Sequence, residues 1–233
     1  MSPRVIAIDG PAASGKSSTA QAVARRLGWA HLDSGALYRA VTLATLDHLE
    51  ERGAGGGPLW SPQRIVALAD QLPVRLVLVS DVFKPEVAGV DVAEAIRSAR
   101  VTRRVSEVAA IPEVRQWVNA QQRRAVEGHP RGVVVDGRDI GTVVFPDAPL
   151  KVFLTASPDE RARRRLAQRG DVIDAAELRR ESDALDARDR ADSTRPVAPL
   201  KPAPDAIPLD TTRLSLAQQV DQVVALADQR LPR

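Results

Sequence analysis

The stretch that decides the fold lies near the start of the chain and reads Val5-Ile6-Ala7-Ile8-Asp9-Gly10-Pro11-Ala12-Ala13-Ser14-Gly15-Lys16-Ser17. Its first five residues form a continuous apolar run that ends in Asp9, as is typical of a central strand in a parallel sheet. From Gly10 to Ser17 the chain matches the whole G-x-x-x-x-G-K-S pattern of a phosphate-binding loop. Residues 16–27 then repeat apolar side chains at helical spacing, and Gly28 marks the helix end.

This loop predicts a nucleotide phosphate site for physical reasons. Glycines let the backbone curl so that successive N–H groups point at one phosphate, and the helix that follows adds its positive end. Lys16 is expected to reach the β- and γ-phosphates, and Ser17 to ligate Mg²⁺. A chance glycine turn is the alternative, and the complete pattern in the right strand-to-helix context leaves it little room.

The rest of the chain alternates strand and helix patterns, which indicates an α/β fold with a mostly parallel sheet. We expect strands at 29–32, 74–79, 133–136, 151–154 and 206–209. We expect helices after Asp33-Ser34, over 100–127, from a Ser157 cap onward and over 214–231. A flexible break is expected at Gly53–Pro58, and a small inserted sheet between 74 and 98. The length of 233 residues fits one domain with an insertion.

Composition narrows the class of protein. There is no cysteine, so disulfide and thiolate chemistry are excluded, and no apolar run reaches the ~20 residues of a membrane helix. No signal peptide pattern is seen, so a cytoplasmic location is expected. Of the 33 basic residues 29 are arginines, but 30 acidic residues are interspersed and leave a formal net charge of +3. We therefore expect no nucleic-acid partner and no membrane partner, because the basic charge is dispersed.

A second anion site is predicted where the next helix begins. Asp33 or Ser34 would cap that helix, whose N-terminus attracts anions, and Arg39 follows just over one turn later. An ordinary capped helix with a surface arginine is the alternative. Beside a complete phosphate loop, we favour the site.

Six blocks of sequence follow one another along nearly the whole chain. They are Ile8-Asp9-Gly10-Pro11 with Gly15-Lys16-Ser17; Leu32-Asp33-Ser34-Gly35-Ala36-Leu37-Tyr38-Arg39; Gly89-Val90-Asp91-Val92 with Ile96-Arg97-Ser98; Val105-Ser106, Ala109-Ala110-Ile111-Pro112 and Val114-Arg115; Asp136-Gly137-Arg138-Asp139-Ile140-Gly141-Thr142-Val143-Val144-Phe145-Pro146-Asp147-Ala148; and Arg188-Asp189, Asp192-Ser193, Arg195 and Pro199-Leu200. In this order they resemble the bacterial cytidylate kinases, which are nucleoside monophosphate kinases. One block alone would be weak evidence, whereas six in order are specific.

The resemblance implies a P-loop NTPase fold over residues 1–233, with a five-stranded parallel sheet flanked by helices. It also implies a nucleoside monophosphate-binding insertion at 59–118 and a short lid at 157–195. The implied activity is Mg²⁺-dependent transfer of the γ-phosphoryl group of ATP to CMP, and also to dCMP. A monomer is expected, with small nucleotides as its partners.

The resemblance also assigns residues. Those expected to hold the ATP phosphates are Gly10, Pro11, Ala12, Ala13, Ser14, Gly15, Lys16, Ser17 and Ser18. Those expected to contact CMP are Ser34, Arg39, Ser106, Arg115, Arg138, Asp139, Asp192 and Arg195. The arginines Arg39, Arg138 and Arg195 would lie on its α-phosphate, and Asp192 on its ribose.

Cytosine recognition is assigned to Ser106, Arg115 and Asp139. Cytosine offers an amino donor that a carboxylate accepts, and acceptors at N3 and O2 that an arginine satisfies. Uracil reverses this pattern, and a hydrogen-bonding site would therefore reject it. The alternatives stay open here: Arg115 as a helix-surface residue, and Asp139 as a mere partner of Arg138.

Charge neutralisation is the expected mechanism, because two polyanions must meet in line without a covalent intermediate. The expected cations are Lys16, Arg39, Arg138, Arg188 and Arg195. Asp33 and Asp136 are candidates for orienting Mg²⁺-bound water, with simple capping as the alternative. Of the lid arginines Arg161, Arg164 and Arg165, we expect Arg164 on the adenine ring and the others in solvent.

Two departures from the family pattern are Ala13, where another glycine is common, and Ala93, where a hydroxyl residue is common. The three histidines fit no metal or nucleophile arrangement and are expected to be structural or exposed.

A kinase for another small acceptor and a slowly hydrolysing nucleotide switch are the competing functions. The Arg115 and Asp139 pair counts against the first, and the second phosphate site against the second.

Overall fold

The computed structural model describes residues 4–49 and 60–231, so the expected break at Gly53–Pro58 lies outside the described residues. Contacts divide the chain into two compact units. The first unit combines residues 1–31 with residues 130–233, and the second comprises residues 32–129.

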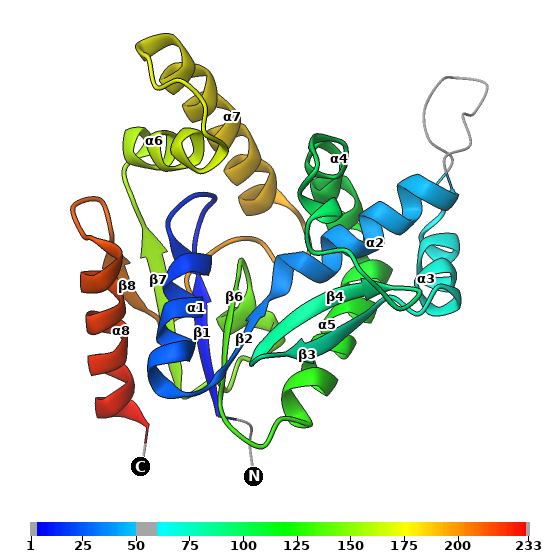
Figure 1. The fold of residues 1–233 in the computed structure, drawn as a ribbon, viewed down its shortest axis with the longest axis horizontal. Helices are drawn as coiled ribbons and strands as arrows, with labels where there is room; N and C mark the ends of the chain where they lie inside the picture. Colours follow the sequence, from blue (N-terminus) through cyan, green and yellow to red (C-terminus); the bar gives the residue numbers. More distant parts are fainter. Residues whose placement is uncertain (1–3, 50–59, 232–233) are drawn as a thin grey trace. The chain divides into compact units, whose positions relative to one another are not determined.

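A parallel sheet forms the centre of the first unit (Figure 1). Strand β1 (Val5–Asp9) lies between β6 (Val133–Gly137) and β7 (Leu150–Thr155), and β7 pairs with β8 (Ile207–Asp210), all in parallel. Strand β2 (Ala30–Asp33) begins in this unit, where the Ala30 amide donates to the Gly132 carbonyl at 3.0 Å. Every residue of β1 is buried, which confirms the predicted central strand and the predicted α/β class.

Helices α1 (Lys16–Leu27) and α8 (Leu216–Arg230) pack against each other in this unit (Figure 1). The bounds of α1 are those predicted, and Gly28 ends it in the left-handed conformation with φ of +65°. Helix α8 starts later than predicted because Ser215 and Gln218 form a capping box. Apolar side chains of both helices join those of β1 and β7 in one core.

The predicted lid region contains two helices, α6 (Pro158–Arg169) and α7 (Ala175–Thr194), which lie side by side (Figure 1, yellow). Ser157 caps α6 as predicted, accepting the Glu160 amide at 3.3 Å. Ala162 of α6 and Leu185 of α7 form a small apolar cluster with Ala12. The base of this helix pair is therefore packed on the phosphate loop.

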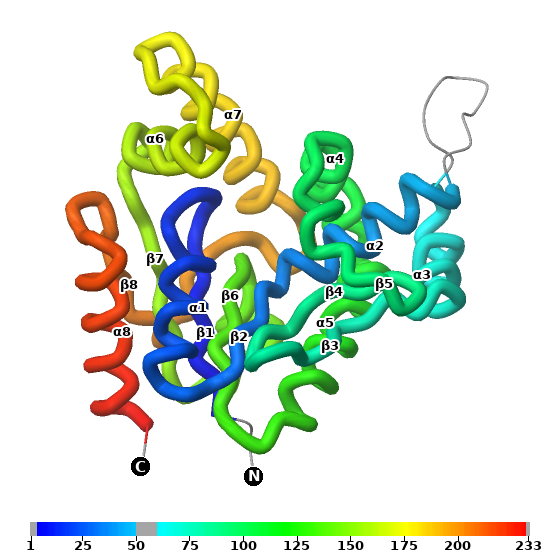
Figure 2. Tube along the Cα trace, in the orientation of Figure 1, coloured from blue at the N-terminus to red at the C-terminus, as the bar shows by residue number. Residues whose placement is uncertain are grey.

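The second unit holds helices α2 (Ser34–His48), α3 (Pro62–Gln71), α4 (Ala99–Ala110) and α5 (Pro112–Glu127), and the short 3₁₀ turn η1 (Ala95–Arg97). Its strands β3 (Arg75–Val79) and β4 (Val82–Val87) form an antiparallel hairpin, to which β5 (Val90–Asp91) adds through β4 (Figure 2). Ser80 and Asp81 both have positive φ, as a tight hairpin turn requires. The predicted small sheet between residues 74 and 98 is confirmed.

The stretch predicted to be helical over 100–127 forms two helices, α4 and α5. They break at Ile111, whose extended conformation (φ −72°, ψ 119°) precedes Pro112. Proline lacks the N–H that would continue the ladder and pushes the residue before it out of the helical region. The insertion predicted at 59–118 falls within the second unit apart from residue 59, which is not described, and its role stays a prediction.

Candidate functional site

The phosphate loop joins β1 to α1 and needs glycine at its first position. A Cβ at Gly10 would lie 2.2 Å from the Leu154 carbonyl oxygen, so no other residue fits there. Gly15 takes φ of +93° at the start of α1. Ala13 also takes a left-handed φ, +57°, which is a glycine-like conformation held by an alanine. The loop therefore keeps the curled shape despite the substitution noted in the sequence.

The carbonyl groups of the loop are held by side chains. Arg138 donates to Gly10 at 3.2 Å, and Lys16 donates to Pro11 at 3.0 Å. Arg161 donates to Ala12 at 3.3 Å. The Ser14 carbonyl accepts from Arg164 at 3.3 Å and from Thr211 at 3.0 Å. Because the carbonyl oxygens are engaged in this way, their dipoles do not oppose an anion at the N–H groups.

The Ser17 hydroxyl and the Asp136 carboxylate form a hydrogen-bonded pair where the loop joins α1. Ser17 Oγ donates to Asp136 Oδ2 at 2.5 Å, and Asp136 Oδ1 lies 2.8 Å from His31 Nε2. Burial by itself would raise the pKa of Asp136, but the contact with His31 and the charges of His31 and Lys16, together with Ser17, hold it below its usual value. Asp136 is therefore an anion in a buried place.

This pair fits Mg²⁺, which prefers oxygen ligands and keeps much of its water. Within the described parts of the chain, no group of three or more His, Cys, Asp or Glu side chains is arranged to hold a metal ion. An ion here would thus rest on Ser17, phosphates and water, with Asp136 behind them. The Ser14 hydroxyl, buried and without a partner among the described residues, is a further polar atom that a nucleotide phosphate would satisfy.

Arginines and aspartates from two segments of the first unit, one after β6 and one at the end of α7, meet beside the loop. Arg138, after β6, donates from Nε to Asp192 at 2.9 Å. Arg195 lies 3.5 Å from Asp139 and 3.9 Å from Asp192, and its Nε donates to the Ala198 carbonyl at 2.6 Å. The structure thus brings four of the predicted CMP contacts together. The pairing Arg138 with Asp192 and Arg195 with Asp139 differs from the expected alternative of Asp139 on Arg138.

Arg188 of α7 is the exception in this group. Among the described residues, no hydrogen bond or ion pair reaches its guanidinium, and its Nε is a buried donor without an acceptor. Burial lowers the pKa of Arg188, and the charge of Arg138 lowers it further, against the attraction of Asp192. A half-buried cation in this state favours an added anion.

Asp9, the last residue of β1, holds the segment that carries Arg138 and Asp139. Its carboxylate accepts the amides of Ile140 at 2.9 Å and Gly141 at 2.8 Å, at the start of the π-helical turn Ile140–Val144. Burial raises the pKa of Asp9 to about 6, although both amides oppose the rise. The strand end therefore fixes the backbone that follows β6.

In the second unit, Asp33 caps α2 by accepting the Gly35 amide at 3.0 Å and lies 3.6 Å from Arg97. Capping was the alternative to its proposed Mg²⁺ role, which stays a prediction. Ser34 is buried, and its carbonyl accepts from Gln122 at 3.0 Å. Arg39 donates to the Ile96 carbonyl at 3.2 Å and to Thr102 Oγ1 at 3.0 Å. Ser34 and Arg39 thus face neighbours from α5, η1 and α4.

Arg115 is buried with 2% of its surface exposed, so the alternative that it is a helix-surface residue is wrong. It donates to the Ala109 carbonyl at 3.0 Å, and its guanidinium carbon lies 5.3 Å from the centre of the Tyr38 ring. Ser106 lies half-buried on α4, which packs against α5. The structure therefore places Ser106 and Arg115 on neighbouring helices of one unit.

The expectation that Arg161 lies in solvent is wrong. It is 6% exposed, because it donates to Ala12, to Asp186 at 3.0 Å and to Asp189. Arg164 is also engaged, donating to the Thr211 carbonyl at 2.7 Å and to Glu160 at 2.9 Å. Its contact with adenine stays a prediction. Arg165, half-buried, donates to Gln168 at 3.1 Å.

Four residues at the site were given no role from the sequence: Asp9, His31, Asp189 and Thr211. Asp189 belongs to the last sequence block but had no role. Thr211 is fully buried and bonds Ser14 and the Thr155 carbonyl. Its position directly after β8 was a signal, because ligands gather at the carboxyl ends of parallel strands. His31 carried no signal.

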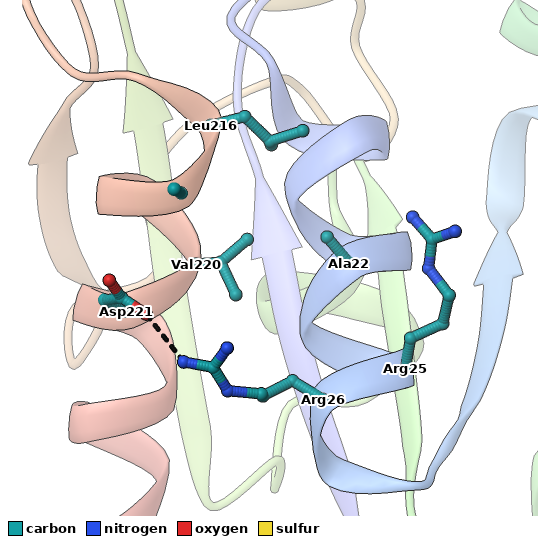
Figure 3. A pocket seen from close by; sticks show the side chains of 7 residues that line it. Ala22, Arg25, Arg26, Leu216, Val220 and Asp221 are labelled. Carbon is teal, nitrogen blue, oxygen red and sulfur yellow. Dashed lines mark hydrogen bonds and ion pairs between the residues drawn. The ribbon is translucent and has the colours of Figure 1, made fainter.

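A pocket of about 480 Å³ lies elsewhere in the first unit, between α1 and α8. Figure 3 shows Ala22 and Val220 facing each other there, with Arg26 and Asp221 paired at 2.8 Å. None of its lining residues is a predicted nucleotide contact. No helix within residues 4–49 and 60–231 has the length and apolarity needed to cross a bilayer.

Known proteins resemble this chain over nearly its whole length. The family described as cytidylate kinase matches residues 6–229. A cytidylate kinase of Limosilactobacillus fermentum is 46% identical over 230 residues, which cover 97% of this chain and 96% of the relative. One of Azotobacter vinelandii is 45% identical over 225 residues, covering 96% and 94%.

A solved structure supports the fold alone. An uncharacterised protein of Eubacterium ventriosum superimposes with a TM-score of 0.53 at 12% identity, covering 97% of this chain and 99% of that one. Because the family matches residues 6–229 and the relatives are similar over nearly the whole chain, this chain belongs to the cytidylate kinase family.

Proposed function

We propose that this protein transfers the γ-phosphoryl group of ATP to CMP, giving ADP and CDP. The observation that carries the proposal is the complete phosphate loop with Arg138, Arg188 and Arg195 gathered beside it in one unit, in a chain of the cytidylate kinase family. A kinase needs a donor site and cations that neutralise the transferred charge, and this unit supplies both.

The donor half rests on the loop from Gly10 to Ser18. The N–H groups of the loop, other than that of Ala12, which donates to Asp189, would bind the ATP phosphates. Lys16 would leave the Pro11 carbonyl for the β- and γ-phosphates. Ser17 would hold Mg²⁺, with Asp136 orienting its water. When bound, the ion neutralises charge on the terminal phosphates. The negative charge of Asp136 is maintained by its neighbours, so it is available at neutral pH.

The acceptor half needs cations for one phosphate and hydrogen bonds for one base. Asp192 pairs with Arg138 and Asp139 with Arg195, so each arginine would already be ordered before a phosphate arrives. Preorganised cations spend little energy on reorganisation during the reaction. Arg39 and Ser34 of α2 would contribute from the second unit.

Cytosine would be read by Ser106, Arg115 and Asp139. The buried Arg115 suits this role, because a buried donor left unpaired by the wrong base is costly. Asp192 would contact the ribose, and we propose that dCMP is also accepted. We further propose that no nucleic acid is bound, because the basic charge in the sequence is dispersed. A monomer that acts on free nucleotides in the cytoplasm, without a membrane partner, completes the proposal.

An ADP-release assay with ATP, Mg²⁺ and CMP, dCMP, UMP or AMP tests this function. We expect ADP formation to depend on the acceptor and to be fastest with CMP and dCMP. Turnover no faster with CMP than with UMP or AMP would overturn the cytosine assignment. ADP release at the same rate with and without an acceptor would overturn the kinase assignment and favour a slowly hydrolysing nucleotide switch.

Asp139→Asn sharpens the test of base recognition. Loss of the carboxylate should reduce the preference for CMP over UMP by about tenfold or more, since hydrogen-bonding sites discriminate strongly. Asp147→Asn, an exposed acid in the same sequence block, is the matched control and should keep the wild-type preference. An unchanged preference in Asp139→Asn would remove Asp139 from the base site.

A further inference from the structure

The backbone of Ala12, in the phosphate loop, is held at both its amide and its carbonyl by the lid helices. The Ala12 N–H donates to Asp189 Oδ1 of α7 at 2.9 Å, and its carbonyl accepts from Arg161 NH1 of α6 at 3.3 Å. Arg161 and Asp189 also pair directly with each other. Two side chains, one from α6 and one from α7, therefore close a ring of hydrogen bonds around the backbone of Ala12.

These two side chains are shielded from water. The side chain of Arg161 is 7% exposed and that of Asp189 is 15% exposed. Arg161 has a second acidic partner, Asp186, at 3.0 Å, but that carboxylate is 46% exposed and has no contact with the loop among the hydrogen bonds of the described residues. Hydrogen bonds between ionised groups are stronger than neutral ones, and more so away from water.

The ring sits next to the strained residue of the loop. Ala13 follows Ala12 directly and takes φ of +57°, which costs roughly 1–2 kcal/mol for a residue with a Cβ. Such a conformation persists when its surroundings over-determine it. On the other side of Ala13, the Ser14 carbonyl is held by Arg164 and Thr211. Lid-based side chains thus anchor the loop on both sides of the strained position.

We propose that Asp189 and Arg161 are positioning residues that hold the phosphate loop in its anion-binding shape, so that the lid base sets the affinity for ATP. The proposal deepens the proposed function, on which it rests for the identity of the triphosphate. Neither residue needs to touch the nucleotide. A loop that is ordered beforehand avoids the entropic cost of ordering on binding.

Asp189→Ala and Asp186→Ala form a matched pair that tests the proposal. Each removes one carboxylate from Arg161, but only Asp189→Ala removes the acceptor of the Ala12 amide. Hydrogen exchange at the Ala12 amide and calorimetric binding of a Mg²⁺-bound, non-hydrolysable ATP analogue, both without CMP, are the readouts. Because no acceptor is present, the result does not depend on which monophosphate the enzyme uses.

For Asp189→Ala we expect about tenfold faster exchange at Ala12 and about tenfold weaker ATP binding, as the loss of one charged hydrogen bond implies. In turnover assays KM for ATP should rise similarly, with little change in KM for CMP. Asp186→Ala should match the wild type within about twofold. Asp189→Asn, which keeps an oxygen acceptor and protects against a folding defect, should fall between wild type and Asp189→Ala.

Wild-type exchange and ATP affinity in both Asp189 variants would overturn the proposal. An equal loss in Asp186→Ala would overturn it too, because the effect would then come from the lid ion pair and not from the loop contact. Failure of CMP to act as acceptor would instead overturn the proposed function and leave these readouts intact.

Discussion

Arg161 and Arg164 of α6 and Arg188 of α7 differ in their partners more than in their burial. Arg161 and Arg164 donate to loop carbonyls and to carboxylates of their own region. Arg188 is also largely shielded, yet no hydrogen bond or ion pair among the described residues reaches its guanidinium. The difference supports the two roles proposed above for one residue type: holding the loop, and receiving a phosphate.

Of the substitutions considered, Arg188→Met should cause the greatest loss of activity. Turnover should fall by about 10³-fold, because an arginine that stabilises the transferred phosphoryl group is worth at least that much. The free energy of unfolding without nucleotide should be unchanged or higher, because the substitution removes a buried cation repelled by Arg138. Steady-state kinetics and urea unfolding measure the two quantities. A marked loss of stability would place Arg188 with the loop-holding arginines.

Arg161→Met should show the opposite pattern. The free energy of unfolding should fall by about 3 kcal/mol, because Asp189 would remain shielded without its cation. Arg163→Met is the matched control on the same helix: its side chain is 56% exposed and lies 3.6 Å from Glu160. That control should stay within about 0.5 kcal/mol of wild type in urea unfolding. Equal stabilities of the two variants would contradict the structural role of Arg161.

Asp9 differs from these arginines because its hydrogen-bond partners only partly offset the effect of burial on its pKa. Its pKa in the folded protein, about 6, is above the usual 3.8, so the folded state binds this proton more tightly than the unfolded chain. Its contribution to stability is therefore full below pH 3.8 and is lost as the pH rises to about 6, by about 3 kcal/mol for a shift of this size.

Asp9→Asn should remove that pH dependence. The difference in unfolding free energy between wild type and variant, measured with urea from about pH 4 to about pH 7, should change in favour of the variant as pH rises. The pKa of Asp136 is lowered, so its contribution is lost only below its usual value of 3.8 and does not overlap this range. A difference independent of pH would contradict the burial of an ionisable Asp9.

Ala13→Gly should change the free energy of unfolding least, and it tests whether the backbone of Ala13 is strained. Glycine adopts positive φ without the Cβ penalty, so the free energy of unfolding should rise by about 1 kcal/mol. For Ala22→Gly, within α1, the free energy of unfolding should fall by about the same amount, because glycine weakens a helix interior. Thermal or urea unfolding of both variants checks the opposite signs. A destabilised Ala13→Gly would mean that Ala13 is not strained.

Local patterns in the sequence predicted the parts of the fold that depend on near neighbours. The bounds of β1 and α1 agree with the prediction because an apolar strand, a glycine loop and a glycine stop lie within 24 residues of sequence. Residues 100–127 were expected to be helical, and they form two helices that break at Ile111, just before Pro112. The six blocks identified the family, which the comparisons confirm.

Partners distant in sequence were beyond these patterns. Arg161 was expected in solvent because a charged residue on a charged helix usually is, yet Ala12 lies 149 positions away and fixes it in the interior. His31 reaches Asp136 across 105 positions. Such pairs depend on how strands and helices pack, and periodicity along the chain carries no record of that.

The most direct test of whether Arg188 receives a phosphate is the stabilisation of the folded protein by nucleotides. Urea unfolding of wild type and Arg188→Met would be measured with and without CMP, Mg²⁺ and a non-hydrolysable ATP analogue. Both proteins would receive each ligand at about 100 times its Kd for the wild type. The free energy of unfolding of the wild type should then rise by about 3 kcal/mol or more. Arg188→Met should begin at least as stable as the wild type and gain less than about half as much. An equal gain in the variant would contradict the assignment.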